Sequence, residues 1–398
     1  MPSTRGSAWC ALLGLVGLGL AGYLVYLHLG LLRGELLGGP ACGSGAFNCH
    51  AVTAGVWGTV LGVPLALWGI LGYIVVIALA LLGRQSPEWA ARAMTLTALL
   101  AGLFVGVDLI LLSLMVFVIR FYCLFCLLTY GVNLLLLIAS VRSLPPPRAA
   151  AFRRLGEALA SLVPSSQRSA AWMFWGIVLM GFFGTAALHA STTFVSRGTL
   201  GSMKRQIREF VTTQPRVQLD TAADPVNGPP TAPLRIVEFS DFLCPACQRA
   251  SKLNIVMLAS HRHDAQFIFK HFPLDTSCND KIGRLLHPGA CQVAAASECA
   301  HLQGKFWAFH DRMFELAGKP FNLDDIDKDP RLGLDLAQFQ DCMAAGKGME
   351  AVKRDIAEGA AIGVNSTPTY IINGLKIGGA MTPSTFEEFA EVLREGGY

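Results

Sequence analysis

Residues 123–141 read CLFCLLTYGVNLLLLIASV, and no charged residue interrupts them. An apolar helix of about 20 residues is long enough to span the hydrocarbon core of a bilayer. The same stretch carries two cysteines three positions apart, Cys123 and Cys126. It therefore indicates a pair of thiols inside a membrane span.

Two other cysteine pairs lie on either side of this stretch, Cys42/Cys49 before it and Cys244/Cys247 after it. Both lie outside the apolar stretches of the chain. Thiol pairs in water next to a thiol pair in lipid suggest a protein that moves electrons between protein thiols and a lipid-soluble carrier.

The composition indicates a membrane protein of an oxidising compartment. The chain of 398 residues is 53% hydrophobic and only 15% charged, which is too apolar for a water-soluble protein. The apolar residues crowd into the first half, whereas the second half has an ordinary soluble composition. The net charge of +4 is modest, so we expect no nucleic acid partner. Eleven cysteines are too many for a typical cytosolic chain.

Five stretches are apolar enough to cross a membrane as helices. The expected spans are Ala8–Leu32, Val56–Leu82, Met94–Ile119, Tyr122–Val141 and Ala170–Ser191. We therefore predict an all-α membrane bundle of five transmembrane helices, of which the first four form the redox core. The first span is too long for a signal peptide, so we expect an uncleaved anchor. The prolines at 145–147 are expected to end the fourth span.

The arginines of the loops predict the orientation, because cytoplasmic loops carry an excess of positive charge. The loops after spans two and four hold Arg84, Arg92, Arg142, Arg148, Arg153, Arg154 and Arg168, against Arg33 and Arg120 in the opposite loops. We therefore expect a multi-pass protein of a bacterial inner membrane with its N-terminus in the cytoplasm. All three cysteine pairs and the C-terminal domain then face the periplasm or the cell exterior.

The second half begins with a strand and a helix around Cys244 and Cys247. IVEFSDF, residues 236–242, reads as a buried strand, and CPACQRASKLNIVML follows as a helix. A cysteine at a helix N-terminus ionises easily, because the amides and the helix dipole stabilise its thiolate. Cys244 is therefore the expected nucleophile and Cys247 the resolving thiol. Further strands are predicted at 266–274 and on both sides of an Asn373–Gly374 turn.

From about Leu234 to Tyr398 the chain resembles the thioredoxin superfamily, in its DsbA-like branch. The resemblance rests on the strand–CPAC–helix unit, the long helical region after the second strand, and Thr367–Pro368 before the last hairpin. It implies an α/β thioredoxin-fold domain with a helical insertion. It also implies a cis peptide bond before Pro368, which packs against the active-site disulfide. The expected domains are 1–145, 146–233 (loop, fifth span and linker) and 234–398.

Four more cysteines lie in this half: Cys278, Cys291, Cys299 and Cys342. Four cysteines allow three pairings, and the sequence does not choose among them. Because they lack CxxC spacing, we expect structural rather than redox bonds, with Cys278–Cys291 and Cys299–Cys342 as the working hypothesis.

Between about Trp9 and Arg142 the chain resembles the vitamin K epoxide reductase family. The matching features are Cys42 and Cys49 in the first outer loop, NCHAV…WGTVLGVP before span two, and CLFCLLTYGVN in span four. The resemblance implies that Cys123/Cys126 is the quinone-side pair and that Cys42/Cys49 shuttles electrons to it. Bacterial members are often fused to a thioredoxin-like domain. The family often has Ser or Thr at the position where this chain has Gly55. The hydroxyl that this residue offers to the cofactor is therefore missing here, unless Thr53 or Thr59 supplies it.

The resemblance also implies quinone contacts. Tyr130 lies one turn after the CxxC pair, and Trp57 and Asn133 lie within the matching motifs. For Tyr130, helix packing is the alternative. Asp108, inside span three, is expected either to accept a proton during quinone reduction or to hydrogen-bond a neighbouring helix.

Two histidines near the proposed membrane site receive weaker interpretations. His28 is expected to be an interface residue at the end of span one. His50 is expected to be an exposed loop residue, the alternative being that it lowers a thiol pKa. No metal-ligand spacing is evident, so we expect no metal.

Together these features predict a membrane thiol:quinone oxidoreductase that drives disulfide formation in exported proteins. Electrons are expected to pass from substrate thiols to Cys244/Cys247, to Cys42/Cys49, to Cys123/Cys126, and then to ubiquinone or menaquinone. Cys49 is expected to exchange with Cys123. The expected partners are exported proteins with free thiols, the membrane lipid and the quinone pool. Three alternatives stay open: an outward-feeding reductase, a vitamin K epoxide reductase proper, and a chaperone-like binding module whose cysteines are only structural.

Overall fold

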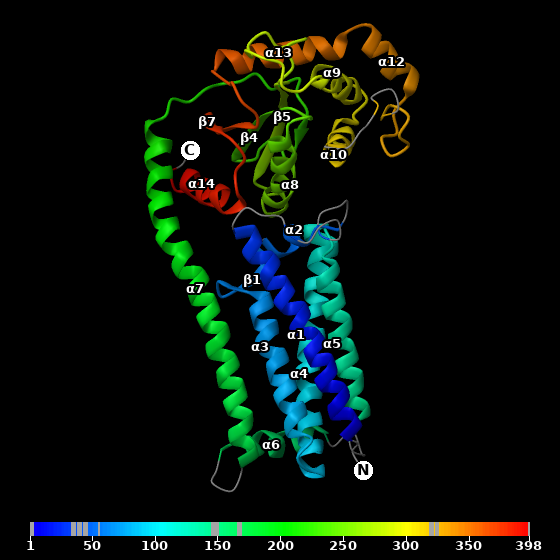
Figure 1. The fold of residues 1–398 in the computed structure, drawn as a ribbon, viewed down its shortest axis with the longest axis vertical. Helices are drawn as coiled ribbons and strands as arrows, with labels where there is room; N and C mark the ends of the chain where they lie inside the picture. The colour runs from blue at the N-terminus through cyan, green and yellow to red at the C-terminus, as the bar shows by residue number, and fades with distance from the viewer. Residues whose placement is uncertain are drawn as a thin grey trace. The chain divides into compact units, whose positions relative to one another are not determined.

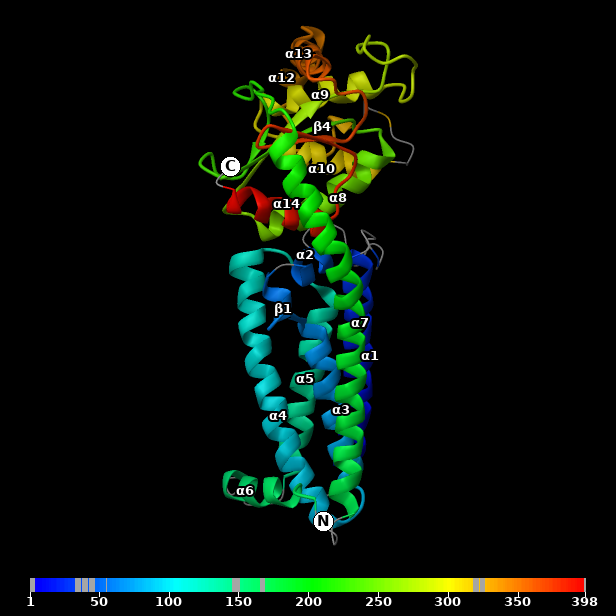
Figure 2. The ribbon, with the colours of Figure 1, turned by 90° about the vertical axis from the view of Figure 1, so that its left-hand side faces the viewer.

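The structure, a computed structural model, describes residues 4–32, 37, 42, 47–54, 56–144, 151–164, 169–317, 322 and 326–396. The chain forms two compact units, Met1–Gly201 and Ser202–Tyr398. Figure 1 and Figure 2 show the first as a set of long helices and the second as a sheet with helices around it. The expected fold class, a membrane bundle followed by an α/β domain, is confirmed.

Four long helices of the first unit pack side by side around one apolar core (Figure 1). They are α1 (Thr4–Leu32), α3 (Leu65–Leu82), α4 (Pro87–Leu114) and α5 (Leu124–Arg142). Helices approach closely where a side chain is absent: at Gly17 of α1, an added Cβ would lie 2.2 Å from the ring of Tyr73 on α3. Ser86 caps α4, because its side chain accepts the Trp89 amide hydrogen at 3.2 Å.

Shorter elements connect these helices. Between α1 and α3 lie α2 (Cys49–Ala54), the 3₁₀ turn η2 (Val56–Gly58), β1 (Thr59–Val60) and β2 (Val63–Pro64). A π-helical turn, η3 (Met115–Ile119), extends α4. After α5 come α6 (Ala151–Ser161) and α7 (Ser169–Thr213).

Within the described residues, five helical segments are long and apolar enough to cross a membrane. They are Gly6–Leu31, Leu65–Leu82, Pro87–Ile119, Leu124–Arg142 and Ser169–Ala190. The five expected spans are confirmed, but the second helix begins at Leu65 instead of Val56. Leu61 and Gly62 have positive φ values of 55° and 74°, so the chain turns back as the β1–β2 hairpin before the helix starts. The prolines at 145–147 lie outside the described residues.

A five-stranded sheet in the order β3-β5-β4-β6-β7 forms the centre of the second unit. Its strands are β3 (Val226–Asn227), β4 (Leu234–Ser240), β5 (Ala265–His271), β6 (Thr369–Ile372) and β7 (Leu375–Gly378). Parallel β4 and β5 are joined by α8 (Pro245–Ser260). Antiparallel β6 and β7 are joined by Asn373 and Gly374, both at positive φ, which suits an Asn-Gly turn.

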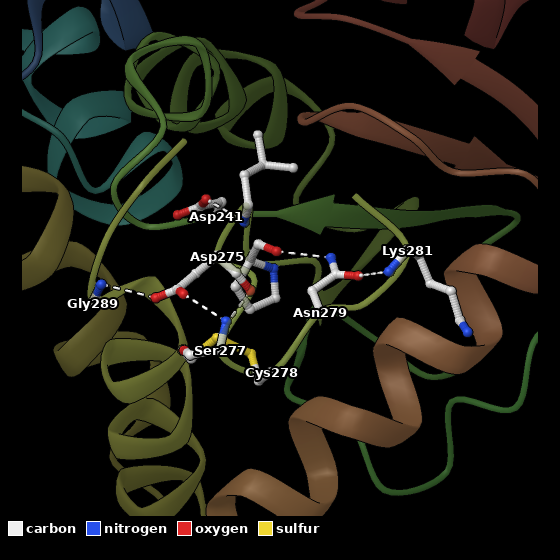
Figure 3. The surroundings of a disulfide bond; sticks show 10 residues. Asp241, Asp275, Ser277, Cys278, Asn279, Lys281 and Gly289 are labelled. Carbon is white, nitrogen blue, oxygen red and sulfur yellow. Dashed lines mark hydrogen bonds between the residues drawn. A yellow bond between two sulfur atoms is a disulfide. The ribbon is translucent and has the colours of Figure 1, made fainter. Parts of the chain in front are cut away.

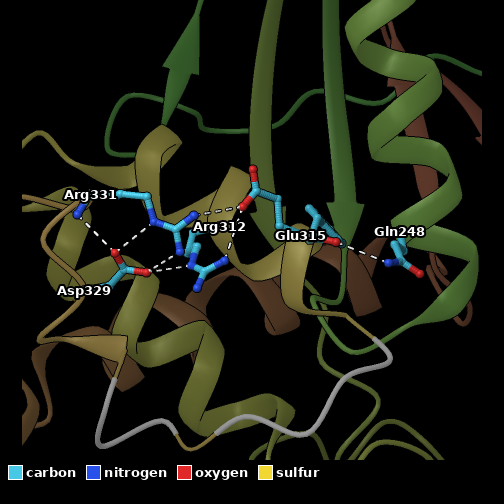
Figure 4. Close-up of polar contacts among 6 residues, drawn as sticks. Gln248, Arg312, Glu315, Asp329 and Arg331 are labelled. Atoms are coloured by element: carbon cyan, nitrogen blue, oxygen red, sulfur yellow. Dashed lines mark hydrogen bonds and ion pairs between the residues drawn. The ribbon is translucent and has the colours of Figure 1, made fainter. Parts of the chain in front are cut away.

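The expected helical insertion lies between β5 and β6. It contains α9 (Ala290–His301), α10 (Phe306–Leu316), α12 (Leu336–Ala344) and α13 (Lys347–Ala361), and α14 (Pro383–Glu395) follows β7. Gln248 of α8 holds the end of α10, because its amide donates to the carbonyl oxygens of Phe314 at 3.2 Å and Ala317 at 3.0 Å. Figure 4 shows Gln248 with a neighbouring ion-pair network of Arg312, Glu315, Asp329 and Arg331. The insertion is thus fastened to the helix that starts at Cys244.

The segment expected as a linker before Leu234 is largely part of the second unit. The α7 helix continues without a break to Thr213, and its residues Ile207 and Val211 are buried against the sheet core. Farther on, β3 pairs with β5, and Asp224 forms an ion pair of 2.7 Å with buried Lys270. The sequence suggested a short amphipathic helix at Thr199–Val211, which lies within α7. It suggested an extended or irregular second part, rich in Pro, Gly and Asp, because the contacts of this part come from residues far away in the chain.

Candidate redox sites

Cys123 and Cys126 lie at the first turn of α5. Cys123 is the N-cap residue, and its sulfur accepts the Cys126 amide hydrogen at 3.2 Å. The two sulfurs are 2.7 Å apart and carry free thiols. Cys123 is buried, whereas Cys126 is half-buried. The CxxC spacing therefore brings both thiols into contact, as a disulfide between them requires.

The loop cysteines Cys42 and Cys49 form a disulfide beside this pair. Asn48, which precedes Cys49, donates its amide hydrogen to the carbonyl oxygen of Tyr122 at 2.9 Å. Tyr122 in turn precedes Cys123. Cys42, Cys49 and Cys123 are buried in one apolar cluster. The fold thus brings the loop pair and the span pair together at one end of the bundle.

A cavity of about 480 Å³ lies between α1, α3, α4 and α5. Cys126 lines it, together with all four residues that the sequence suggested as quinone contacts: Tyr130, Trp57, Asn133 and Asp108. These residues come from α4, α5 and the η2 turn. Cys123 is not among the lining residues, so Cys126 is the thiol of the pair that a molecule in the cavity meets.

Asp108 belongs to a buried polar chain that links three helices. Asn133 Nδ2 donates to Asp108 Oδ2 at 2.8 Å, and the Tyr73 hydroxyl donates to Asn133 Oδ1 at 2.7 Å. Polar groups within a membrane need such partners, because no water is present to satisfy them. The hydrogen bond expected as one alternative for Asp108 is therefore present, and Asp108 also lines the cavity.

Further polar residues of the cavity are His28, Thr53 and Thr129. The sequence did not assign His28 to the site, because nothing local in α1 indicates that it lines a cavity with residues of α4 and α5. Thr53, one of the two possible substitutes for the missing hydroxyl, donates its own hydroxyl to the Cys49 carbonyl oxygen at 2.8 Å. Gly55 lies outside the described residues.

His50 is not the exposed loop residue that the sequence suggested. Only 3% of its surface is exposed, and its Nε2 lies 2.7 Å from the Leu37 carbonyl oxygen. The prediction was wrong because α2 packs against α1 and α5. Burial lowers the pKa of His50, and the hydrogen bond to Leu37 opposes this effect. A neutral imidazole supplies no charge to lower the pKa of a loop thiol.

Cys244 and Cys247 flank the first turn of α8, directly after β4. Cys244 is the N-cap residue, and its sulfur lies 3.6 Å from the carbonyl oxygen of Thr367. The Thr367–Pro368 peptide bond is cis, as the resemblance implied. Cys244 is 6% exposed and Cys247 is fully buried, so Cys244 is the thiol that another protein can reach.

The two thiols of this pair ionise very differently. A hydrogen bond from Cys247 lowers the pKa of Cys244 to about 5; amides of the first turn of α8 act in the same direction, and burial opposes them. Burial raises the pKa of Cys247 well above its usual range. At neutral pH, Cys244 is therefore the thiolate and Cys247 keeps its proton.

Glu238, in the middle of β4, is a residue that the sequence reasoning missed. Its carboxyl is 1% exposed and accepts hydrogen bonds from Ser240 Oγ at 2.9 Å and Asn254 Nδ2 at 2.7 Å. Burial raises the pKa of Glu238 to about 8, although both hydrogen bonds oppose this. Its charge in turn contributes to the raised pKa of Cys247. The acidic residue inside the otherwise buried strand IVEFSDF was the available signal.

The remaining cysteines of the second unit pair as hypothesised, Cys278 with Cys291 and Cys299 with Cys342. The first bond closes a loop between β5 and α9, and the second links α9 to α12. Figure 3 shows Asp241, from the turn before Cys244, in the surroundings of the first bond.

Known proteins resemble parts of the chain. Among curated proteins, Na(+)/H(+) antiporter NhaA 3 of Salinispora tropica is 31% identical over 188 residues, which are 46% of this chain and 27% of that protein. NhaA 1 of Mycolicibacterium vanbaalenii is 34% identical over 161 residues, 38% of this chain and 24% of that protein. The chain thus spans about a quarter of the length of the curated relatives that it matches.

Among solved structures, a thioredoxin-like oxidoreductase from Silicibacter pomeroyi is 24% identical and covers 44% of this chain and 94% of its own, with a TM-score of 0.38. BdbD from Bacillus subtilis is 22% identical and covers 45% of this chain and 96% of its own, with a TM-score of 0.36.

Two family models match the chain itself. The model of the vitamin K epoxide reductase family matches residues 8–141, and that of a thioredoxin family matches residues 220–392. These ranges contain the membrane cysteine pairs and the CPAC pair, respectively. The chain therefore carries a vitamin K epoxide reductase family domain joined to a thioredoxin family domain.

Proposed function

We propose that this protein is a membrane thiol:quinone oxidoreductase that forms disulfide bonds in exported proteins. One observation carries the proposal: the Cys42–Cys49 disulfide lies beside Cys123, and the partner thiol Cys126 lines a cavity of about 480 Å³. A thiol pair between a disulfide and an apolar cavity suits a protein that passes electrons from one to the other.

In the proposed relay, each step between cysteine pairs is a thiol–disulfide exchange through a mixed disulfide. The Cys244–Cys247 disulfide oxidises two substrate thiols and becomes a dithiol. That dithiol reduces Cys42–Cys49, which then reduces Cys123–Cys126, with Cys49 exchanging with Cys123. Each complete exchange moves two electrons and two protons, so the thiol count is conserved.

The cavity fits a quinone ring. Its walls are mostly apolar, and few polar side chains reach it, which is typical of sites for apolar ligands. A bound quinone would supply the final acceptor for the two electrons and two protons of the Cys123/Cys126 pair. Tyr130, Asn133 and Trp57 would hold the quinone, and Asp108 would hold a proton.

The ionisation of Cys244 favours the oxidising direction over an outward-feeding reductase. A pair whose reduced form is stabilised is a strong oxidant. The pKa of Cys244, lowered to about 5 by the hydrogen bond from Cys247, stabilises the reduced form as a thiolate. This stabilisation supports electron flow from the thiols of exported proteins towards the membrane.

The location follows from the arginine-rich loops, which belong on the cytoplasmic side. In this arrangement the protein crosses a bacterial inner membrane five times. Its three redox pairs and its thioredoxin domain face the periplasm or the cell exterior, where substrate thiols appear.

The test is quinone reduction by the purified full-length protein with a reduced dithiol peptide as donor. Replacing Cys123 and Cys126 with Ser should abolish quinone reduction but leave two turnovers of peptide oxidation, one for the Cys244–Cys247 disulfide and one for Cys42–Cys49. Replacing Cys244 and Cys247 should abolish peptide oxidation. Cys10→Ser, a buried free thiol outside the relay, is the control. Undiminished quinone reduction without Cys123 and Cys126 would refute the proposal.

A further inference from the structure

His287 lies on a loop that the proposed relay does not use. The loop runs between Cys278 and Cys291 and is closed by their disulfide. The main-chain amides of Leu286 and His287 both donate to the Leu274 carbonyl oxygen at 3.0 Å. The backbone at His287 is therefore fixed to the segment that follows β5.

Asp275 holds the two ends of the same loop together, as Figure 3 shows. Its carboxylate accepts the Ser277 amide at 2.9 Å and the Gly289 amide at 2.8 Å. Asn279 adds a hydrogen bond from its side chain to the Pro273 carbonyl oxygen at 2.8 Å. The loop is thus a rigid support rather than a loose connection.

The side chain of His287 reaches the turn that carries the nucleophile. Its Nδ1 lies 2.6 Å from Asp241 Oδ2. The buried Asp241 carboxylate also accepts the amide hydrogens of Leu243 at 2.8 Å and Leu274 at 2.9 Å. The main-chain oxygen of Asp241 accepts the Cys244 amide at 3.1 Å. One residue therefore contacts both the imidazole and the backbone of the nucleophile.

The charges around His287 favour its protonated form. Among the described ion pairs, Asp241 is matched with His287 and with no Lys or Arg, and removing one partner of a buried ion pair leaves an uncompensated charge. The hydrogen bond to Asp241 raises the pKa of His287, and the charge of Cys244 acts in the same direction. Of the nearby acids, Asp275 accepts the main-chain amide hydrogens of the loop ends, and exposed Asp280 pairs with Lys281.

We propose that His287 is a positioning residue for thiol exchange: as an imidazolium held by Asp241, it stabilises the Cys244 thiolate. Ala246 leaves no charged side chain between the two cysteines of the CPAC motif, so this cation comes from a separate loop. The Cys278–Cys291 disulfide keeps that loop in place, and opening the bond weakens the effect. This inference rests on the proposed role of Cys244 as the nucleophile.

The experiment measures how fast iodoacetamide alkylates Cys244 in the full-length protein as a function of pH. Mild reduction opens Cys244–Cys247, and peptide mass spectrometry verifies that Cys278–Cys291 stays closed. The alkylation midpoint of the natural sequence should lie near pH 5. His287→Gln keeps a hydrogen-bond donor without the charge. At pH values below the midpoint, it should reduce the alkylation rate about tenfold, which corresponds to a rise of one unit in the pKa of Cys244.

Two further variants separate charge from structure. His287→Lys keeps a cation and should restore most of the lost rate. His263→Gln, at an exposed histidine of the same unit, is the matched control and should change nothing. A double variant, Cys278→Ser with Cys291→Ser, should slow alkylation in the same direction as His287→Gln.

The outcomes distinguish this inference from the proposed function. A midpoint near that of an ordinary thiol in the natural sequence would overturn the role of Cys244 and, with it, the proposed relay. A low midpoint that His287→Gln leaves unchanged would overturn the inference about His287 alone. An unchanged midpoint in the folded double variant would overturn the supporting role of the disulfide.

Discussion

At the scale of single residues, the thiols of Cys244 and Cys247 lie three positions apart but have pKa values shifted in opposite directions. Cys244 caps a helix and receives a hydrogen bond from Cys247, whereas Cys247 is enclosed in the core close to Glu238. The position of each thiol relative to the helix end and the core, and not the residue type, decides which one is the thiolate.

Replacing Glu238 with Gln should stabilise the folded protein, and the gain should grow as the pH rises from about 5 to about 8. Burial raises the pKa of Glu238 from 4.5 to about 8, so in this window the folded chain holds a proton that the unfolded chain has released. The stability of the natural sequence therefore falls as the pH rises, and the neutral amide removes this loss. Melting temperatures at both ends of the window measure it.

The control for this prediction is Asp280→Asn, at an acid whose side chain is 80% exposed. It should show the same pH dependence as the natural sequence. A stability difference between Glu238→Gln and the natural sequence that stays constant with pH would contradict the raised pKa of Glu238.

The redox potential of the Cys244/Cys247 pair should be oxidising, closer to about −120 mV than to the about −270 mV of thioredoxin. The physical reason is the low pKa of Cys244, to which the hydrogen bond from Cys247 contributes most. Equilibration with glutathione buffers followed by alkylation measures the potential. A value near that of thioredoxin would favour the relay running outward as a reductase.

At the scale of elements, close contacts between helices at glycine positions organise the membrane unit. The α1 helix meets α3 at Gly17, directly over the Tyr73 ring. Tyr73 then reaches α5 and α4 through Asn133 and Asp108. A tight helix contact and the polar wall of the cavity are therefore parts of one arrangement.

Gly17→Val should destabilise the membrane unit, because the added Cβ would lie 2.2 Å from the Tyr73 ring. Overpacking of this kind costs about 1–3 kcal/mol. Thermal unfolding in detergent measures the loss. Gly19→Val on the same helix is the matched control, since a Cβ there meets nothing within 4 Å. Equal melting temperatures for the two variants would show that the α1–α3 contact is not tight.

At the scale of the whole molecule, one chain joins two units of different composition. The first is a bundle of helices with the composition of membrane spans, and the second is built around a five-stranded sheet. The orientation of the bundle in the membrane decides which compartment the relay serves.

Impermeant maleimide should label Asp280→Cys in intact cells but label Glu88→Cys only after lysis. Both side chains are well exposed, at 80% and 69%. They lie on opposite sides of the membrane if the arginine-rich loops are cytoplasmic. Peptide mass spectrometry separates these sites from the natural thiols. The reverse labelling pattern would mean that the orientation is inverted and that the relay faces the cytoplasm.

Much of this protein was predictable from its local sequence. The five spans, the strand before Cys244, the helix after it and the Asn373–Gly374 turn all formed as expected, because they depend on neighbours in the chain. The second span started late because a hairpin with positive φ at Leu61 and Gly62 preceded it, and apolar composition alone does not reveal such a turn.

The sites needed contacts between residues far apart in the chain. Only folding brought Asn48 against Tyr122, Trp57 and Asp108 onto one cavity, and His287 against Asp241. Burial then decided the chemistry of Glu238 and His50, which the sequence missed or misread. The local pattern determines which segments cross lipid and which cysteine starts a helix. Desolvation and long-range hydrogen bonds arise from packing, so the tertiary structure alone decided which groups meet and how they ionise.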